Sequence, residues 1–256
     1  MTTVTHINVG TTFHSYFRPT IANSEISLEE VYRIRYQVYC QEFNYDLKDS
    51  ITGQQERDHY DSHSIHCLML SESTGESAGC VRLVLTDPAD PEAPLPFEKY
   101  CGHTLNHAII DPARLPRDKI GEISRLAVLP YYRRRYLDAA NPCGLDGNRP
   151  VSATEQRHFP YIPLGLYLAA ASLGLLSGLQ GVFAAMDPRL ARHLRGYGIN
   201  FLQVGKVMDY HGQRAPFYID RDMLLYGLKP DMQDLLLTLM DDMKADMRRK
   251  NLHVVK

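Results

Sequence analysis

The sequence predicts an α/β (α+β) fold, with one mixed, mostly antiparallel central sheet and helices on both of its faces. Three features support this class: short apolar runs separated by turn residues, an uncharged stretch at 159–186, and an amphipathic tail at 231–249. Apolar periods near 2 residues mark strands, and periods near 3.6 residues mark helices. Their order predicts a helix, then antiparallel strands, then a strand–helix–strand unit.

The first helix is predicted to begin at a capping box. Residues 1–26 show no clear periodicity, and Ser27-Leu28-Glu29-Glu30 then has the Ser-x-x-Glu spacing that satisfies the first backbone N–H groups of a helix. The apolar stripe of this helix comprises Val31, Ile34 and Val38.

The remaining elements follow from turn residues and apolar periodicity. Strands are predicted at 65–70, 78–85 and 121–128, with a turn at 73–76 and a Pro-rich loop at 87–96. An irregular insertion at 133–158 is followed in order by a helix at 163–180, a strand at 181–186, a short helix at 187–196, and strands near 201–207 and 217–224. We therefore expect an N-terminal segment (1–26), a domain (27–228) and a C-terminal amphipathic helix (229–256).

Composition narrows the class of protein. The 256 residues are 44% hydrophobic and 23% charged, which is typical of a soluble globular protein. Because 28 Lys and Arg stand against 30 Asp and Glu, a nucleic-acid partner is disfavoured. The five cysteines are scattered, without a CxxC pair, which suits a reducing, cytoplasmic location.

Membrane and metal sites are not expected. The uncharged stretch at 159–186 is long enough to span a bilayer, but its glycines and prolines favour a buried helix that runs into a strand. The first residues show no basic region followed by an apolar run, so no signal peptide is expected. His59, His63 and His66 straddle a change from loop to strand, so their spacing does not indicate a metal site.

Four polar clusters are candidates for chemistry. Two lie before the first strands, Arg33-x-Arg35-x-x-x-Tyr39 and the acidic run Glu56-Arg57-Asp58-His59-Tyr60-Asp61. Two lie inside apolar strands, Gly79-Cys-Val-Arg82 and Gly121-Glu122-Ile-Ser124-Arg125. Arg35 and Tyr39 are four residues apart and share a helix face, and Glu122 and Ser124 alternate with Ile123 and Arg125 across the sheet.

Charges inside apolar strands must be paired, because burying an unpaired charge costs several kcal/mol. Arg82 is therefore expected to pair, and so is Glu122 or Arg125. A purely structural ion-pair network is one interpretation of these residues, and Asp58 and Asp61 alone also suit helix caps or solvated loops.

The order of the clusters adds a resemblance to a known family. Arg35-x-x-x-Tyr39, Asp58-x-x-Asp61, Arg82 and Glu122-x-x-Arg125 resemble the signature of acyl-homoserine-lactone synthases in the GNAT (acetyltransferase-like) superfamily. More closely, Ile34-Arg-Tyr-Gln-Val-Tyr-Cys-Gln-Glu42, Ile123-Ser-Arg-Leu-Ala-Val128 and His211-Gly-Gln-Arg-Ala-Pro-Phe217 look like PEP-CTERM/exosortase-associated acyltransferases and the related N-acyl amino acid synthases. The resemblance covers roughly residues 28–225.

The resemblance implies a GNAT-like fold and an enzyme that moves a long-chain acyl group from acyl carrier protein to an amine. Acyl-CoA is the other donor it allows, and no tightly bound cofactor is implied. By position, the family's polar cluster, which orders the N-terminal segment and positions the amine, corresponds to Arg35, Tyr39, Asp58, Asp61, Arg82, Glu122, Ser124 and Arg125. Glu122 matches the carboxylate proposed as the catalytic base.

The residue types suit this chemistry. An α-amino group has a pKa of about 7.7–8.0, so a positioned carboxylate needs to remove one proton as the thioester is attacked. We expect Arg125 or Arg82 to keep Glu122 ionised, and an arginine to hold the carboxylate of an amino acid. A backbone N–H near Val128 is expected to meet the oxyanion.

Two departures from the superfamily concern the donor. No glycine-rich phosphate loop follows the third strand, where Arg133, Arg134 and Arg135 stand instead and suit an acidic carrier protein, or else a solvated turn. The leaving thiolate has no assigned acid, because Arg195 takes the place of the family's tyrosine and Tyr197 is better explained as structural.

The predicted function is therefore N-acyl transfer from acyl carrier protein to the α-amine of an amino acid or a similar small amine. Two alternatives stay open: an acyl-homoserine-lactone synthase that uses S-adenosylmethionine, and a non-catalytic module that binds the acyl chain or its carrier. Acetyl-CoA-dependent acetylation is a third. The glycines of the uncharged helix suit either an acyl channel or close packing. The sequence leaves the oligomeric state open, and a homo-oligomer is one of the states that it allows.

Overall fold

The central sheet is mixed and mostly antiparallel, as the sequence predicts. The computed structural model describes residues 9–45, 50–133 and 152–252. Within these residues the strands follow the order β1-β4-β5-β6-β7-β10-β8, with β9 paired to β10, and only β6 and β7 are parallel. The strands are β1 (Phe17–Ala22), β4 (Ser64–Ser71), β5 (Ser77–Leu85), β6 (Ile120–Val128), β7 (Gly181–Met186), β8 (Leu202–Gln203), β9 (Met208–Asp209) and β10 (Gln213–Asp220).

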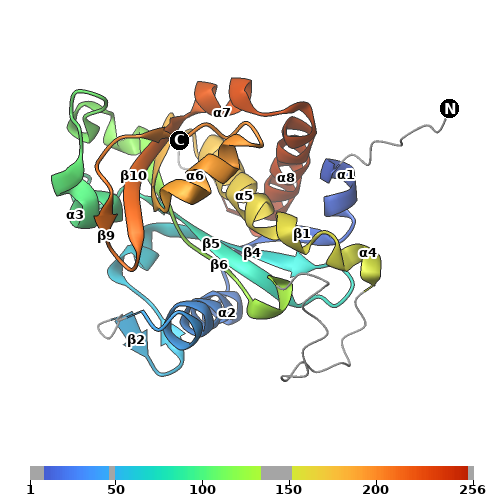
Figure 1. The fold of residues 1–256 in the computed structure, drawn as a ribbon. Coiled ribbons are helices and arrows are strands. Elements are labelled where there is room, and N and C mark those ends of the chain that lie inside the picture. The colour runs from blue at the N-terminus through green and yellow to red at the C-terminus, as the bar shows by residue number, and fades with distance from the viewer. Residues whose placement is uncertain (1–8, 46–49, 134–151, 253–256) are drawn as a thin grey trace.

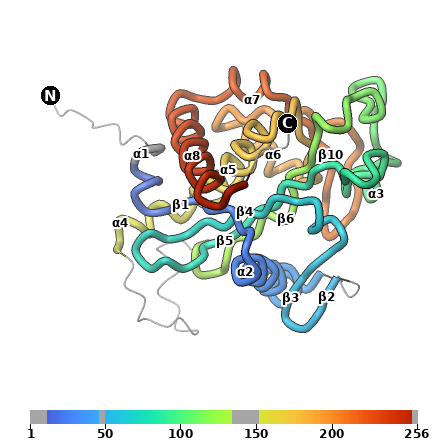
Figure 2. The backbone as a smooth tube through the Cα atoms, turned by 180° about the vertical axis from the view of Figure 1, so that it is seen from behind, coloured from blue at the N-terminus to red at the C-terminus, as the bar shows by residue number. Residues whose placement is uncertain are grey.

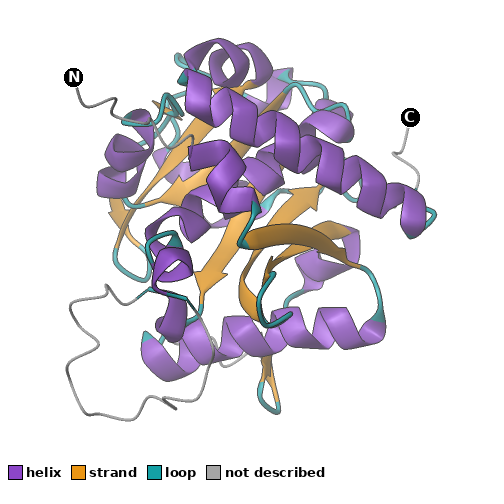
Figure 3. Ribbon diagram, turned by 90° about the vertical axis from the view of Figure 1, so that its right-hand side faces the viewer, coloured by secondary structure: helices purple, strands orange, loops and turns teal. Residues whose placement is uncertain are grey.

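Helices cover both faces of this sheet. Helices α5 and α8 lie on one face and α2 lies on the other (Figure 1); the strands between these layers are also visible in Figure 3. The α-helices are α1 (Val9–His14), α2 (Glu25–Arg35), α3 (Pro96–Cys101), α4 (Ala153–Gln156), α5 (Ile162–Leu176), α6 (Pro188–Arg195), α7 (Arg221–Gly227) and α8 (Pro230–Arg249). The first segments of the chain lie beside the last helix, because α1 and β1 both contact α8 (Figure 2).

Short helical turns and one hairpin complete the chain. A π-helix, η1 (Tyr36–Glu42), continues α2, and the hairpin β2 (Ile51–Thr52) and β3 (Gln55–Glu56) follows it. The 3-10 turns are η3 (His59–His63), η4 (Gly102–Thr104), η5 (Pro112–Arg114), η6 (Arg117–Lys119), η7 (Pro130–Tyr132) and η9 (Phe159–Tyr161).

The uncharged stretch forms a core helix. By length and composition the helical stretch Ala153–Leu176 could cross a membrane, but 72% of its apolar window is buried inside the protein. A Cβ added to Gly165 would lie 2.6 Å from the Phe13 ring, so this glycine allows close packing of α5 on α1. Gly178 ends the helix with φ +72°. Close packing is therefore the role of Gly165.

Several predicted boundaries are wrong. Helix α2 begins three residues early, because Ser24 is the N-cap and its capping box is completed by Ser27 rather than by Glu30. Residues 1–26 contain α1 and β1, where no element was predicted. Of the strand expected near 201–207 only Leu202–Gln203 forms, and residues 221–224 lie in α7 instead of a strand.

Strands β6 and β7 diverge, and this opens the sheet. Their parallel pairing covers only Ile120–Gly181, Gly121–Val182 and Glu122–Phe183, although β6 continues to Val128. A bulge lies just beyond this point, since Cys80 pairs with Ala127 but Arg82 pairs with Ser124. Arg125 sits in the bulge with φ +52°. Past Glu122, the edge of β6 that faces away from β5 pairs with no strand in the described part of the chain.

Candidate active site

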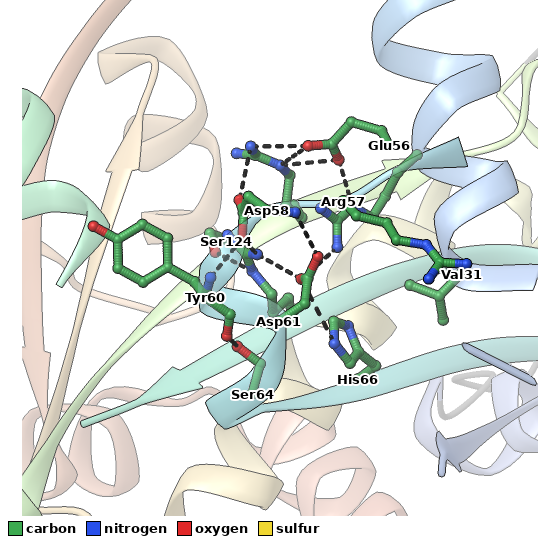
Figure 4. Close-up of polar contacts among 12 residues, drawn as sticks. Val31, Glu56, Arg57, Asp58, Tyr60, Asp61, Ser64, His66 and Ser124 are labelled. Carbon is green, nitrogen blue, oxygen red and sulfur yellow. Dashed lines mark hydrogen bonds and ion pairs between the residues drawn. The ribbon is translucent and has the colours of Figure 1, made fainter. Parts of the chain in front are cut away.

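Three arginines and three carboxylates form a closed ring of ion pairs on the α2 face of the sheet. We call it the ion ring, and its members alternate in charge in the order Arg35, Glu56, Arg125, Asp58, Arg82 and Asp61. In Figure 4, dashed lines mark the hydrogen bonds and ion pairs that join the carboxylates of Glu56, Asp58 and Asp61 to nearby nitrogen atoms. The ring joins four parts of the chain: the end of α2, the segment 56–61, β5 and β6.

The contacts within the ion ring are short and mostly buried. Arg35 donates from Nε to Glu56 at 2.5 Å and from Nη1 to Asp61 at 2.7 Å. Arg82 Nη1 donates to Asp58 at 2.5 Å and to Asp61 at 2.6 Å. Arg125 closes the ring through Nη2, which lies 3.1 Å from both Glu56 and Asp58. The predicted pairing of Arg82 is therefore correct, but its partners are Asp58 and Asp61.

The ring fixes the charge of its carboxylates. Burial alone raises the pKa of Asp61, but Arg35 and Arg82 outweigh it and hold that pKa well below its usual range. The pKa of Glu56 is lowered in the same way, against burial, by Arg125 and Arg35. The pKa of Asp58 is lowered by Arg82 and Arg125 despite burial. Three positive and three negative charges thus balance.

Local structure explains how the acids reach the ring. Asp58 is the N-cap of η3 and accepts a hydrogen bond from Tyr60 N at 3.0 Å, while Asp61 accepts one from Asp58 N at 2.8 Å. These two acids are therefore caps and ring members at once. Glu56 is the last residue of β3 and is fully buried.

Glu122 is buried close to the ring but is not paired with an arginine. Its Oε2 accepts a hydrogen bond from Phe97 N at 2.6 Å, at the start of α3. Burial raises the pKa of Glu122 to about 8, although the Phe97 N–H, Arg82 and Arg125 oppose the shift. The expectation that arginines keep this carboxyl ionised at neutral pH is wrong, because burial outweighs the opposing effect of Arg82 and Arg125, which are ion-paired with ring carboxylates.

Glu122 opens onto a cavity of about 360 Å³ in the gap between β6 and β7. One wall is the free part of β6 from Ser124 to Val128, and the opposite wall is Ala184 to Asp187. Leu129 N donates to Ala78 on β5, so by strand alternation Val128 N–H points away from β5 and toward this gap. Pro163 and Tyr167 of α5 and Leu190 of α6 also line the cavity.

Aromatic side chains from separate segments frame the cavity. Tyr45, which follows η1, stacks on His211 of the β9–β10 turn with ring centroids 4.8 Å apart. Tyr100 of α3 stacks on Tyr210 at 5.1 Å. Arg214, at the start of β10, donates to Tyr45 Oη at 3.3 Å and also lines the cavity.

Most of the predicted site residues gather at this cavity. Those that line it are Tyr39, Asp58, Arg82, Glu122, Ser124, Arg125, Val128 and Arg133. Arg35 and Asp61 belong to the ion ring but not to the cavity wall. Arg134 and Arg135 lie outside the described residues.

One further expectation, the orientation of Arg125, is corrected by the geometry. Strand alternation predicted that Arg125 would face away from Ser124, but the bulge turns it toward the same ring that Arg82 joins, and Arg82 Nε donates to Ser124 Oγ at 3.2 Å. Arg133 is ion-paired with Glu42 and donates to Val128 O at 2.8 Å, and its contact with a carrier protein stays a prediction.

Sequence reasoning missed two residues of this region. Glu56 was part of the acidic run but was given no role, and Arg214 lay in the motif at 211–217 without one. An acid two residues before Asp58, on a strand, was the available signal for Glu56.

Among the described residues, no group of three or more histidine, cysteine or acidic side chains is arranged to hold a metal ion.

Comparisons with known proteins agree with this geometry. Residues 34–140 match the family described as acetyltransferase (GNAT) domain. No curated protein sequence matches the chain. The part that matches the family holds the end of α2, the ion ring and all of β6.

Solved structures share the fold at low identity. The CoA-dependent acyl-homoserine lactone synthase BjaI, solved with SAM and isopentyl-CoA, is 17% identical with a TM-score of 0.56, over 88% of this chain and 89% of that one. FeeM, an N-acyl amino acid synthase from uncultured soil microbes, is 11% identical with a TM-score of 0.54, over 83% and 94%. The AHL synthase LasI is 16% identical with a TM-score of 0.53, over 83% and 95%. The fold is therefore GNAT-like.

Proposed function

We propose that this protein is an N-acyltransferase that moves an acyl group from a thioester to the amine of a small acceptor. The observation that carries the proposal is Glu122, a buried carboxyl with a pKa of about 8 that lines the cavity between β6 and β7. A carboxylate whose pKa lies near the working pH is a stronger base than an ordinary carboxylate, so it is suited to take the proton that the amine nitrogen loses.

The reaction is a single acyl transfer. The amine nitrogen attacks the thioester carbonyl carbon, a C–N bond forms and the C–S bond breaks. Ionised Glu122 takes the proton that the nitrogen loses, and the thiolate takes up a proton and leaves as a thiol. The Val128 N–H, which points toward the gap, is suited to donate to the oxyanion that develops on the carbonyl oxygen.

The ion ring contributes by holding the site rather than by reacting. Its six charges cancel, so it offers no surplus carboxylate to a cationic substrate and leaves the protonation of Glu122 to burial. Arg82 and Arg125 nevertheless lie close enough to oppose the rise in the pKa of Glu122. We assign them an electrostatic role beside the base, and Tyr39, Asp58 and Ser124 a place on the wall that the acceptor meets.

The donor is proposed to be a long-chain acyl carrier protein, with acyl-CoA as the alternative. The apolar wall formed by Pro163, Ala184, Met186 and Leu190 suits an acyl chain. The solved relatives include both an N-acyl amino acid synthase and a CoA-dependent synthase. We propose the α-amine of an amino acid as the acceptor, and a cytoplasmic location. The link to PEP-CTERM and exosortase systems stays a prediction.

The experiment is a transfer assay with purified protein. Dodecanoyl-CoA and dodecanoyl carrier protein are supplied with a panel of amino acids and simple amines, while free thiol and N-acylated product are both measured. The proposal expects stoichiometric thiol and amide. Glu122→Gln should lower turnover by about 10²- to 10⁴-fold, as expected when a general base is lost.

A matched control separates this effect from damage to the fold. Glu155 is also a buried glutamate, but it accepts a hydrogen bond from Ser71 Oγ at 2.8 Å and does not line the cavity. Glu155→Gln should keep turnover close to that of the wild type. Equal activity of Glu122→Gln and wild type would remove Glu122 from the mechanism. A lactone formed only with S-adenosylmethionine would identify a homoserine-lactone synthase, and donor binding without any thiol release would identify a non-catalytic module.

A further inference from the structure

Arg214 lines the cavity and forms no ion pair with any of the residues that the structure describes. The other arginines on the described cavity wall are each paired: Arg82 with Asp58 and Asp61, Arg125 with Glu56 and Asp58, and Arg133 with Glu42. Among the described residues Arg214 forms no ion pair: Asp187, whose pKa it helps to lower, is paired with Arg189 at 2.7 Å, and the side-chain hydrogen bond of Arg214 goes to the Tyr45 hydroxyl at 3.3 Å. A partly buried guanidinium in this position is available to an anionic ligand.

Strand register places Arg214 on the same face of the sheet as Glu122. Glu122 pairs with Phe183, and Phe183 pairs with Tyr218, so these three side chains share a face. Arg214 is four residues before Tyr218 on β10 and therefore points to that face too. The opposite face of β7 and β10, which includes Ala184 and Phe217, packs in the core with α5.

The surroundings of Arg214 suit the acceptor rather than the donor. Its side chain donates to Tyr45 Oη, and the Tyr45 ring stacks on His211. Tyr45 comes from the segment after η1, and His211 comes from the β9–β10 turn. They close the cavity on the Glu122 face, where an amine must lie to give its proton to that carboxyl. Arg133, in contrast, follows the far end of β6, where its Nε is bonded to Val128 O at 2.8 Å.

We infer that Arg214 binds the carboxylate of the acceptor, and that the acceptor is therefore an amine that also carries a carboxylate. The inference deepens the proposed function and rests on it. A guanidinium offers two parallel N–H donors, which match the two oxygens of a carboxylate. With Glu122 at the amine and Arg214 at the carboxylate, the two ends of an amino acid are recognised from the same face of the sheet.

Binding of a product analogue tests the assignment without any turnover. Titration calorimetry compares N-dodecanoylglycine with N-dodecanoylglycinamide, which lacks only the negative charge. The wild type should bind the acid about tenfold or more tightly than the amide, as a charge-assisted pair requires. Arg214→Met should abolish this preference, and Arg214→Lys, which keeps the charge but not the paired donors, should retain part of it.

Arg192→Met is the matched control. Arg192 is an exposed arginine of α6 that does not line the cavity. This variant should keep the full preference for the acid. An equal affinity of the wild type for acid and amide, or no binding of either, would overturn the assignment, as would an unchanged preference in Arg214→Met.

Kinetics with S-dodecanoyl-N-acetylcysteamine identify which anion Arg214 binds, because this donor carries no phosphate. Arg214→Met should raise KM for glycine about tenfold or more and leave KM for glycinamide unchanged. If the variant instead raised KM only for dodecanoyl-CoA, Arg214 would bind the phosphate of the donor and the assignment would be wrong. A wild type that binds the acid through Arg214 but acylates no amine would refute the proposed function and not this assignment.

Discussion

Two buried glutamates, Glu56 and Glu122, differ in what surrounds them and therefore in what they can do. Glu56 contacts Arg35 and Arg125, so its pKa is lowered and it stays charged. Glu122 has a backbone N–H as its partner, and burial raises its pKa to about 8. One carboxyl is thus fixed in its charge and serves structure, whereas the other can gain and lose a proton near neutral pH.

The ion ring predicts a strong effect of removing one carboxylate. Asp61→Asn leaves Arg35 and Arg82, both almost fully buried, short of a negative charge. We expect the free energy of unfolding to fall by about 3–5 kcal/mol, the usual cost of breaking a buried ion pair. Urea denaturation at pH 7 measures this change.

The control for this prediction is an exposed ion pair. Asp118 contacts Lys119, and its side chain is 72% exposed, so Asp118→Asn should change the free energy of unfolding by less than about 1 kcal/mol.

The pKa of Asp61 is lowered in the folded protein, so the contribution of Asp61 to the free energy of unfolding is present above a pH of about 4 and is lost as the pH falls. Equal losses in the two variants, or no reduction in acid sensitivity in Asp61→Asn, would contradict the account of the ring.

Residue types could be predicted from the sequence, but their partners could not. Arg82 inside an apolar strand had to be paired, and it is. That Arg125 would join Glu56 rather than Glu122 depends on the bulge in β6, which strand alternation cannot reveal. The ionisation of Glu122 was mispredicted because its depth of burial, which raises the pKa despite Arg82 and Arg125, is set by the packing of distant segments such as α3.

At the scale of elements, the start of α2 gives a direct test of the observed cap. Ser24 Oγ accepts from Ser27 N at 3.3 Å, and Ser24 N donates to Ser27 Oγ at 3.0 Å. Ser24→Ala should therefore lower the free energy of unfolding by about 1 kcal/mol. Glu30→Gln should cost about 0.5 kcal/mol or less, since Glu30 makes only a surface pair with Arg33. The reverse ranking in thermal or urea denaturation would support the cap first predicted at Ser27.

The central strands were predictable, and the peripheral ones were not. Apolar runs identified β4, β5, β6 and β7 within one residue at each end, because their burial imposes the pattern. Strand β1 contains Pro19, which argues against a central strand, and it is tolerated because β1 pairs on one side only, with β4, among the described residues. Strands of two residues, such as β8 and β9, carry no periodicity to detect.

At the scale of the whole molecule, the sheet is a scaffold with a built-in opening. Close pairing of β6 with β7 stops at Glu122, so the base lies where the two strands part and the cavity begins. The ion ring holds α2 and the segment 56–61 against β5 and β6 beside that opening. Aromatic residues from the segment after η1, α3 and the β9–β10 turn then frame the cavity.

The most direct test of the central claim is the pH dependence of acyl transfer with two acceptors whose amines differ in pKa. For the wild type at saturating acceptor, turnover should rise with pH through a value near 8 with both acceptors, because ionised Glu122 is the base. In Glu122→Gln this rise should disappear together with most of the turnover. A rise that shifts with the pKa of the acceptor and persists unchanged in Glu122→Gln would contradict the claim.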